Sequence, residues 1–271
     1  MPELPEVETT VNGIRPWLEN KTIQSIKIHN PSLRWKIPAD IADRFKSQKV
    51  TAVSRRAKYI LIHFHNQETL IMHLGMSGSL TIITEAKKLA KHDHFEMIMD
   101  DGTILRFNDP RRFGCILDSV DYKQHKLIKN LGPEPLTDAF DGLLLKCKAK
   151  NKTQAIKNYI MDGKIVVGVG NIYASEALFL AAIHPKTQAG RLSLKRYEKL
   201  AAAIKQILSQ AIKAGGTTLK DFINVDGKPG YFAQELHVYG KKDQACSRCQ
   251  KPIKQITLGQ RSTFYCSYCQ K

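Results

Sequence analysis

Cys246-Ser-Arg-Cys249 and Cys266-Ser-Tyr-Cys269, sixteen residues apart, decide the fold of the C-terminal end of this 271-residue chain. Two Cys-x-x-Cys pairs at this separation supply four thiolates for one tetrahedral zinc ion. Because Cys fills all four positions, we expect one structural Zn²⁺ with no open position for a catalytic water. The alternative is a pair of disulfides, which a reducing compartment disfavours.

The residues around these cysteines predict a short β-hairpin. Segments 253–257 and 261–265 are expected to form two strands around Leu258-Gly259-Gln260, as in a zinc ribbon. Residues 241–271 contain seven Lys or Arg and one acid, so the module is expected to face DNA. The two other cysteines, Cys115 and Cys147, stand alone and are predicted to be small buried hydrophobic residues.

The chain before the cysteines is expected to be helical. Apolar periodicity predicts helices over 153–161, 172–182 and 193–214, the last one ended by Gly215-Gly216. Gly168-Val169-Gly170-Asn171 opens the second helix; its backbone could hold a phosphate, although such a turn is also common in ordinary helical pairs. The long polar stretch 215–232 is of the kind that is functional or disordered.

The first 130 residues are expected to be mainly β-structure after one leading helix. The helix is predicted over 5–19, with a kink or an interruption at Pro16. The expected strands are 23–28, 50–54, 59–65, 69–74, 95–99 and 103–107, with Asp101-Gly102 as a hairpin turn. Gly132-Pro133-Glu134-Pro135 marks a linker to the helical part.

Charge points to a polyanionic partner. The chain has 42 Lys and Arg against 25 Asp and Glu, a formal net charge of +17, which favours nucleic acid as the partner. A merely soluble basic protein is the plain alternative, and a membrane surface fits less well because no basic amphipathic helix is evident. The sequence has no apolar run of the ~18 residues that a membrane span needs, and no signal peptide. We therefore expect a cytoplasmic protein that associates with DNA.

The N-terminus Met1-Pro2-Glu3-Leu4-Pro5-Glu6 resembles that of the formamidopyrimidine-DNA glycosylases. Other motifs of that family follow in its order, and the resemblance covers essentially the whole chain. They are Arg55-Arg56-Ala57-Lys58, His73-Leu74-Gly75-Met76, Lys91-His92-Asp93-His94, Asp109-Pro110-Arg111-Arg112-Phe113-Gly114 and Gly168–Tyr173.

The resemblance implies a bifunctional enzyme of base-excision repair. It would excise oxidised purines such as 8-oxoguanine and formamidopyrimidines, then nick the strand by β,δ-elimination as an AP lyase. Removal of Met1 would free the Pro2 amine, which can attack the sugar and form an iminium (Schiff base). In other contexts Pro2 would only stiffen the chain. Glu3 is implied as acid/base and Lys58 as an elimination and phosphate residue. Glu6 is implied as a supporting carboxylate, or else simply a helix N-terminal acid.

Further positions match residues that hold DNA in the family. The expected DNA contacts are His73, Met76, His92, Arg111, Phe113, Lys157, Asn171, Thr217, Thr218 and Tyr231. Met76, Arg111 and Phe113 would fill the gap left by the flipped nucleotide. Without their motifs, Met76 and Phe113 would be interpreted as residues of the hydrophobic core. The resemblance also implies a catalytic role for Arg261 at the hairpin tip, where it would hold a phosphate beside the lesion. The zinc ligands would be Cys246, Cys249, Cys266 and Cys269.

The fold implied is α+β with two domains: an N-terminal β-sandwich with flanking helices, and a C-terminal helix-two-turn-helix bundle with a zinc-ribbon β-hairpin. The expected boundaries are 1–132 for the catalytic domain, 133–150 for a linker, 151–236 for the helical domain with a lesion-recognition loop at 215–232, and 237–271 for the finger. The expected partner is double-stranded DNA with an oxidised purine or abasic site, bound by a monomer. Two alternatives remain: a non-catalytic DNA-binding damage sensor, and the same chemistry on oxidised pyrimidines.

Overall fold

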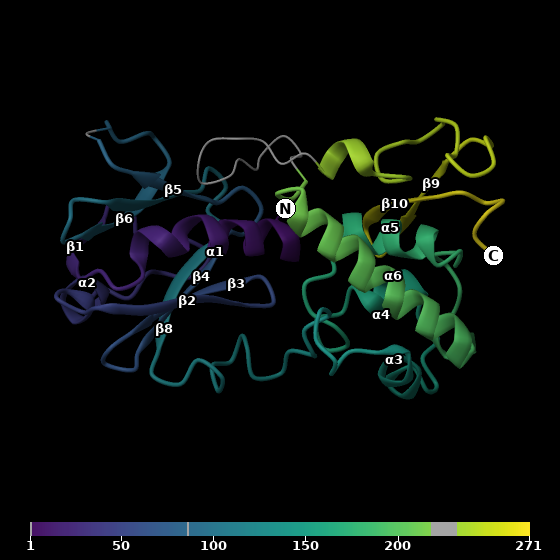
Figure 1. Ribbon diagram of the computed structural model, residues 1–271, viewed down its shortest axis with the longest axis horizontal. Helices are drawn as coiled ribbons and strands as arrows, with labels where there is room; N and C mark the ends of the chain where they lie inside the picture. Colours follow the sequence, from purple (N-terminus) through teal and green to yellow (C-terminus); the bar gives the residue numbers. More distant parts are fainter. Residues whose placement is uncertain (1, 86, 218–231) are drawn as a thin grey trace. The chain divides into compact units, whose positions relative to one another are not determined.

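The computed structural model describes residues 2–85, 87–217 and 232–271 (Figure 1). The chain forms two compact units. Unit 1 comprises Met1–Lys129 and Ala214–Tyr231, and unit 2 comprises Asn130–Lys213 and Phe232–Lys271. Within the described ranges no helix is both long and apolar enough to cross a membrane.

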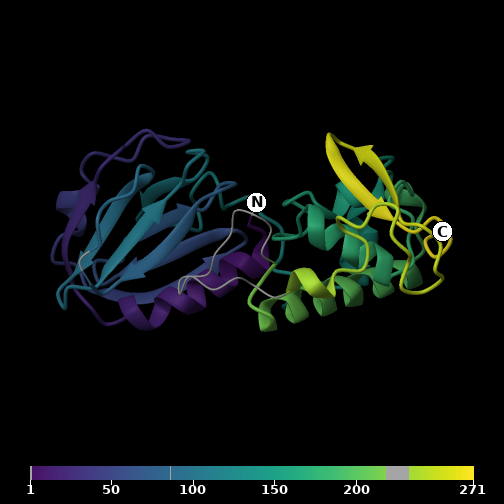
Figure 2. The same ribbon diagram turned by 90° about the horizontal axis from the view of Figure 1, so that it is seen from above.

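Unit 1 is built from two four-stranded antiparallel sheets, which appear as separate layers in Figure 2. The first has the order β1-β6-β7-β5 and the second the order β2-β3-β4-β8. The strand bounds are Ile23–Ile28 (β1), Val50–Arg56 (β2), Tyr59–Phe64 (β3), Thr69–His73 (β4), Ser79–Ile83 (β5), Asp93–Met99 (β6), Ile104–Asn108 (β7) and Cys115–Ser119 (β8). The inner faces of both sheets share one apolar core, which makes this unit the predicted β-sandwich.

Helix α1 (Leu4–Leu18) packs its apolar stripe into this core. Val7, Val11, Ile14 and Leu18 are buried, as the sequence periodicity predicted. Pro16 does not interrupt the helix, which continues to Leu18. Proline there removes one hydrogen bond near the helix end, and the burial of Leu18 holds the last turn in place. A short helix, α2 (Ile41–Phe45), closes the β1 side.

Unit 2 contains four helices among its described residues, with the hairpin at the end. Their bounds are Gly142–Lys148 (α3), Ile156–Ile160 (α4), Asn171–Leu180 (α5) and Leu194–Lys213 (α6), and the hairpin strands are Lys254–Leu258 (β9) and Arg261–Tyr265 (β10). Two short 3₁₀ turns lie at Ala189–Arg191 and Phe232–Glu235. The hairpin turn has positive φ at Gly259 and Gln260, the geometry that a two-residue turn requires.

Helix α3 lies inside the segment 133–150 that the sequence predicted as a linker. Asp141 caps the helix, its side chain accepting the Leu144 backbone N–H at 2.7 Å. A Cβ on Gly142 would lie 2.5 Å from backbone atoms of Glu198 in α6, so only glycine permits this close packing. Cys147, predicted to be buried, is exposed, because it falls on the face of α3 opposite the buried Leu145. Cys115 is buried in β8 as predicted.

Candidate functional site

The start of α1 is organised by a buried carboxylate. Pro2 is buried, and Glu3 and Glu6 are each only 2% exposed. Glu3 is the N-cap, and it forms a capping box with Glu6, whose Oε2 accepts the Glu3 N–H at 2.8 Å. The other oxygen, Oε1, accepts the Thr217 N–H at 2.8 Å. Glu6 therefore fixes Thr217 to the turn that carries Pro2 and Glu3.

His73, at the end of β4, is held as a neutral donor. Burial, reinforced by the positive charges of Lys58 and Arg34, lowers the pKa of His73 from 6.5 to about 4. The Gly75 N–H donates to Nδ1 at 2.9 Å, so the proton of the neutral ring is on Nε2. His73 can therefore donate a hydrogen bond from Nε2 at neutral pH. Lys58 is the second residue of the two-residue turn between β2 and β3, and its charge acts on His73.

A cavity of about 810 Å³ in unit 1 brings several predicted DNA contacts together. Its lining residues are Ser32, Leu33, Arg34, His73, Gly75, Met76, Arg111, Arg112 and Phe113. The Arg111 guanidinium lies 5.1 Å from the centre of the Phe113 ring, and that ring is 44% exposed, which rules out a core position for it. His92 does not line this cavity, but its carbonyl accepts the Asp109 N–H at 3.0 Å.

Asp109 and Arg34 are residues of this region that the sequence analysis did not single out. Asp109 is fully buried; its Oδ1 accepts the Ser77 hydroxyl at 2.7 Å, and its Oδ2 accepts the Gly114 N–H at 2.8 Å. It thus holds the loop that carries Arg111 and Phe113. The Asp109-Pro110 pair is a turn signal that could have indicated this role. Arg34 lines the cavity from a loop that carries no recognisable sequence motif.

Unit 2 brings Lys157, Asn171 and Arg261 into one region. Lys157 is fully buried, and its Nζ donates to Asn171 Oδ1 at 2.6 Å. It also contacts the two β10 residues that follow Arg261. Tyr239, which the sequence analysis missed, places its hydroxyl 3.4 Å from Asn171 Nδ2. Thr218 and Tyr231 fall outside the described residues, as does most of the predicted loop 215–232.

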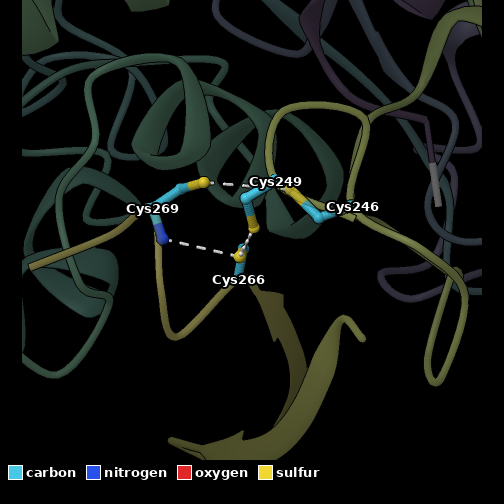
Figure 3. A group of neighbouring side chains, drawn as sticks. All are labelled: Cys246, Cys249, Cys266 and Cys269. Atoms are coloured by element: carbon cyan, nitrogen blue, oxygen red, sulfur yellow. Dashed lines mark hydrogen bonds between the residues drawn. The ribbon is translucent and has the colours of Figure 1, made fainter. Parts of the chain in front are cut away.

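The four cysteines of the two Cys-x-x-Cys motifs converge at the base of the hairpin (Figure 3). Their sulfur atoms all lie within 4.8 Å of one another, with Cys249 and Cys266 3.5 Å apart and Cys246 and Cys269 3.9 Å apart. A tetrahedron with Zn–S bonds of about 2.3 Å places its sulfur atoms about 3.8 Å apart. All four are free thiols rather than disulfides, so the donor set fits one zinc ion.

Comparison with known proteins identifies the class. A model described as the formamidopyrimidine-DNA glycosylase N-terminal domain matches residues 1–116, and one described as the H2TH domain of the same proteins matches residues 131–223. The fold and the two matches define a DNA glycosylase of the helix-two-turn-helix class. The chain belongs to the formamidopyrimidine-DNA glycosylase family, which confirms both the family resemblance and the fold class expected from the sequence.

Individual relatives agree over the full length. The formamidopyrimidine-DNA glycosylase of Marinobacter nauticus is 55% identical over 271 residues, covering all of both chains. A complex of Lactococcus lactis Fpg with DNA containing an abasic site has a TM-score of 0.91 at 32% identity, covering 99% of each chain. A MutM complex with DNA containing carbocyclic 8-oxo-G has a TM-score of 0.91 at 33% identity, covering 100% of each chain.

Proposed function

We propose that this chain excises oxidised purines from DNA and then cleaves the strand at the resulting abasic site. The observation that carries the proposal is the family membership over the whole chain, together with the buried Pro2-Glu3-Glu6 turn. Relatives are seen bound to DNA with an abasic site or an 8-oxoguanine analogue, which supports the same lesion class here. The enzyme would work in the cytoplasm on the bacterial chromosome.

Chemistry would begin at the Pro2 amine once Met1 has been removed. An unperturbed α-amine titrates near pH 8, so a useful fraction is neutral at pH 7 and nucleophilic. Its nitrogen forms a bond to the sugar C1′ while the bond to the base breaks, and the base leaves with the bonding electrons and a proton. Opening of the sugar ring, with a proton added to the ring oxygen, gives an iminium. The iminium stays a cation, because the nitrogen of a secondary amine has no second proton to lose.

Strand cleavage would follow from that iminium. The cationic nitrogen acidifies the C2′ proton, and loss of this proton expels the 3′ phosphate by β-elimination; a second elimination expels the 5′ phosphate, and water then releases the enzyme. We assign the proton transfers to Glu3 and assistance in the elimination to Lys58. Glu6 would keep Glu3 and Thr217 in place through its two hydrogen bonds.

DNA would be held by side chains of both units. His73 would donate its Nε2–H to a phosphate, Asn171 and Arg261 would bind phosphates too, and His92 would be a further contact of the lesion strand. Met76, Arg111 and Phe113, which share one cavity, would occupy the space of the flipped nucleotide. Thr217, Thr218 and Tyr231 would contact the flipped base.

Zinc would have a structural role in this proposal. Cys246, Cys249, Cys266 and Cys269 would hold it, and the ion would supply the cross-link that keeps the two knuckles and the hairpin together. Arg261 at the start of β10 depends on that hairpin for its position.

Borohydride trapping tests the reaction directly. The native chain is incubated with reductant and a duplex that holds one 8-oxoguanine opposite cytosine. We expect a covalent protein–DNA species that disappears in Pro2→Gly, and no such species with an oxidised pyrimidine at comparable yield. Lesion-selective binding without trapping would contradict the lyase and point to a damage sensor. Intact-mass spectrometry of the same sample checks that Met1 is absent.

A further inference from the structure

Lys157 occupies an unusual position for a cation expected to touch DNA. Its side chain is fully buried. Its ammonium donates to protein acceptors that include Asn171 Oδ1 at 2.6 Å, Thr263 Oγ1 at 2.8 Å and the Ser262 carbonyl at 3.1 Å. An ammonium directed into the protein in this way does not present its charge at the surface.

The contact with Asn171 decides which way that amide faces. A lysine can only donate hydrogen bonds, so the oxygen of the amide, not its nitrogen, must face Lys157. The nitrogen Nδ2 then faces the Ser262 carbonyl at 3.0 Å and the Tyr239 hydroxyl at 3.4 Å. The Ser262 carbonyl is the one that also accepts from Lys157. A flipped amide would place N–H groups against the ammonium and its oxygen against a carbonyl oxygen. Lys157 therefore fixes the orientation of the Asn171 amide.

The same ammonium also joins two separate elements. Asn171 is the first residue of α5, where backbone N–H groups lack helical partners. Ser262 and Thr263 directly follow Arg261 in β10. The hairpin tip is close as well, since a Cβ on Gly259 would lie 3.0 Å from Asn158 Nδ2. One buried cation thus sets the spacing between the start of α5 and the start of β10.

We propose that Lys157 is a positioning residue for phosphate binding: it acts through Asn171 and Ser262 rather than by touching DNA. A phosphodiester oxygen only accepts hydrogen bonds, so the Asn171 amide can serve it only through Nδ2. Lys157 keeps the amide in that orientation by holding its oxygen, and a phosphate would take the place of the Tyr239 hydroxyl, the more distant partner of Nδ2. The inference rests on the proposed function, since it presumes that Asn171 binds a phosphate of lesion DNA.

A double-mutant cycle on DNA affinity tests this inference. The variants are Lys157→Met, Asn171→Ala and the double variant, and the ligand is a duplex with one tetrahydrofuran abasic analogue. We expect each single variant to weaken binding by about 10-fold, and the double variant by no more than about 2-fold beyond either one. The slope of log Kd against log salt should stay native in Lys157→Met. Lys195→Met, at an exposed lysine of α6, is the matched control for removing one charge.

Direct phosphate contact by Lys157 predicts a different result. The two losses would then multiply to about 100-fold, and the salt slope would fall by about 0.9 in Lys157→Met. Native affinity in a folded Lys157→Met protein with full zinc content would equally overturn the inference. If Lys157→Met does not fold, Lys157→Gln replaces it in the salt titration. Its amide can still donate to Asn171, so the inference predicts near-native affinity and a native salt slope, whereas direct phosphate contact predicts a slope lower by about 0.9. A native chain that does not prefer the lesion duplex contradicts the proposed function itself, and this inference with it.

Discussion

Single buried carboxylates hold the backbone that carries the proposed functional side chains. Glu6 divides its two oxygens between the N–H groups of Glu3 and Thr217, and Asp109 uses both oxygens to hold the loop before Gly114. Glu176 in α5 accepts the backbone N–H groups of residues 237–239, all within 2.9 Å. Ionised carboxylates bonded to several N–H groups fix backbone more tightly than neutral acceptors do. Each of these residues organises its neighbours without having to touch a ligand.

His73 predicts how the stability of unit 1 responds to acid. Its pKa is about 4 in the folded chain against 6.5 for the free side chain, so between these values the unfolded chain binds the additional proton. Stability from this group is therefore complete above pH 6.5 and is lost as the pH falls toward 4. A shift of this size corresponds to at most about 3 kcal/mol.

Urea unfolding at pH 7, 5.5 and 4.5 checks this prediction. His73→Gln should lose less stability over this range than the native chain, because the substituted residue does not titrate. His65→Gln, at an exposed histidine, should follow the native curve. A His73→Gln curve parallel to the native one would contradict a buried neutral His73.

At the scale of elements, the sequence located most strands and the long helices and missed four short elements. The predicted strand 23–28 and the hairpin strand 261–265 coincide with β1 and β10, and the helix expected over 193–214 is α6 within one residue at each end. The strands β5 and β8 and the helices α2 and α3 were not predicted. Each is seven residues or fewer, so its periodic pattern is weak. Strand β10 is as short, but the cysteine pairs and the turn at Gly259 mark its position in the sequence.

Some residues of the candidate site could be named from the sequence, and others appear only in the structure. Residues inside family motifs, such as Met76 and Phe113, could be named as candidates because the motif fixes their place. Asp109 stands in the same motif as Phe113, but its hold on the loop appears only in the structure. Arg34 and Tyr239 lie outside the motifs, and their importance comes from what the fold packs beside them. Lys157 was expected as a DNA contact, and only the structure shows that its ammonium is buried among Asn171 and β10.

The turn after β4 predicts a sharp glycine requirement. A Cβ on Gly75 would lie 2.4 Å from backbone atoms of Phe113 and Gly114, so Gly75→Ala must displace the loop that carries Arg111 and Phe113. We expect a loss of about 3 kcal/mol in unfolding free energy, and weaker preference for the lesion duplex. Gly102→Ala is the matched control, since Gly102 also has positive φ but no atom within 4 Å of the added carbon. It should cost only about 1 kcal/mol. Equal effects of the two variants in urea titrations would argue against the clash.

Zinc removal should affect α5 as well as the hairpin. Within the first cysteine knuckle, Arg248 donates to the carbonyls of Phe179 and Leu180 at the end of α5, and Gln270 beside the second knuckle donates to Ile183 at 2.9 Å. Loss of the metal should release these caps, lower the melting temperature by several degrees and weaken DNA binding at least about 10-fold. Cys249→Ser and chelation of the native chain should act alike, with zinc content measured in parallel. Undiminished lesion binding by Cys249→Ser would contradict a structural role for the site.

At the scale of the whole molecule, the surplus positive charge is unevenly compensated. Arg15, Arg44, Arg55 and Arg106 each have a carboxylate partner. In the part of the chain that the structure covers, no carboxylate lies within 4.0 Å of the guanidinium groups of Arg34, Arg111 or Arg112, which line one cavity. Unpaired arginines gathered at one place are the electrostatic footprint of a phosphate-binding surface.

This distribution predicts which arginines contribute to salt-dependent DNA binding. Each phosphate neutralised by the protein adds about 0.9 to the slope of log Kd against log salt. Arg34→Gln and Arg112→Gln should each reduce that slope by about 0.9 and weaken binding several-fold at low salt, for lesion and plain duplex alike. Arg15→Gln removes the same charge from an arginine already paired with Glu19, so it should leave the slope unchanged. Fluorescence anisotropy at about 50 to 200 mM salt measures the slope for all three variants. A native slope in Arg34→Gln and Arg112→Gln would show that the unpaired arginines face solvent rather than the DNA backbone.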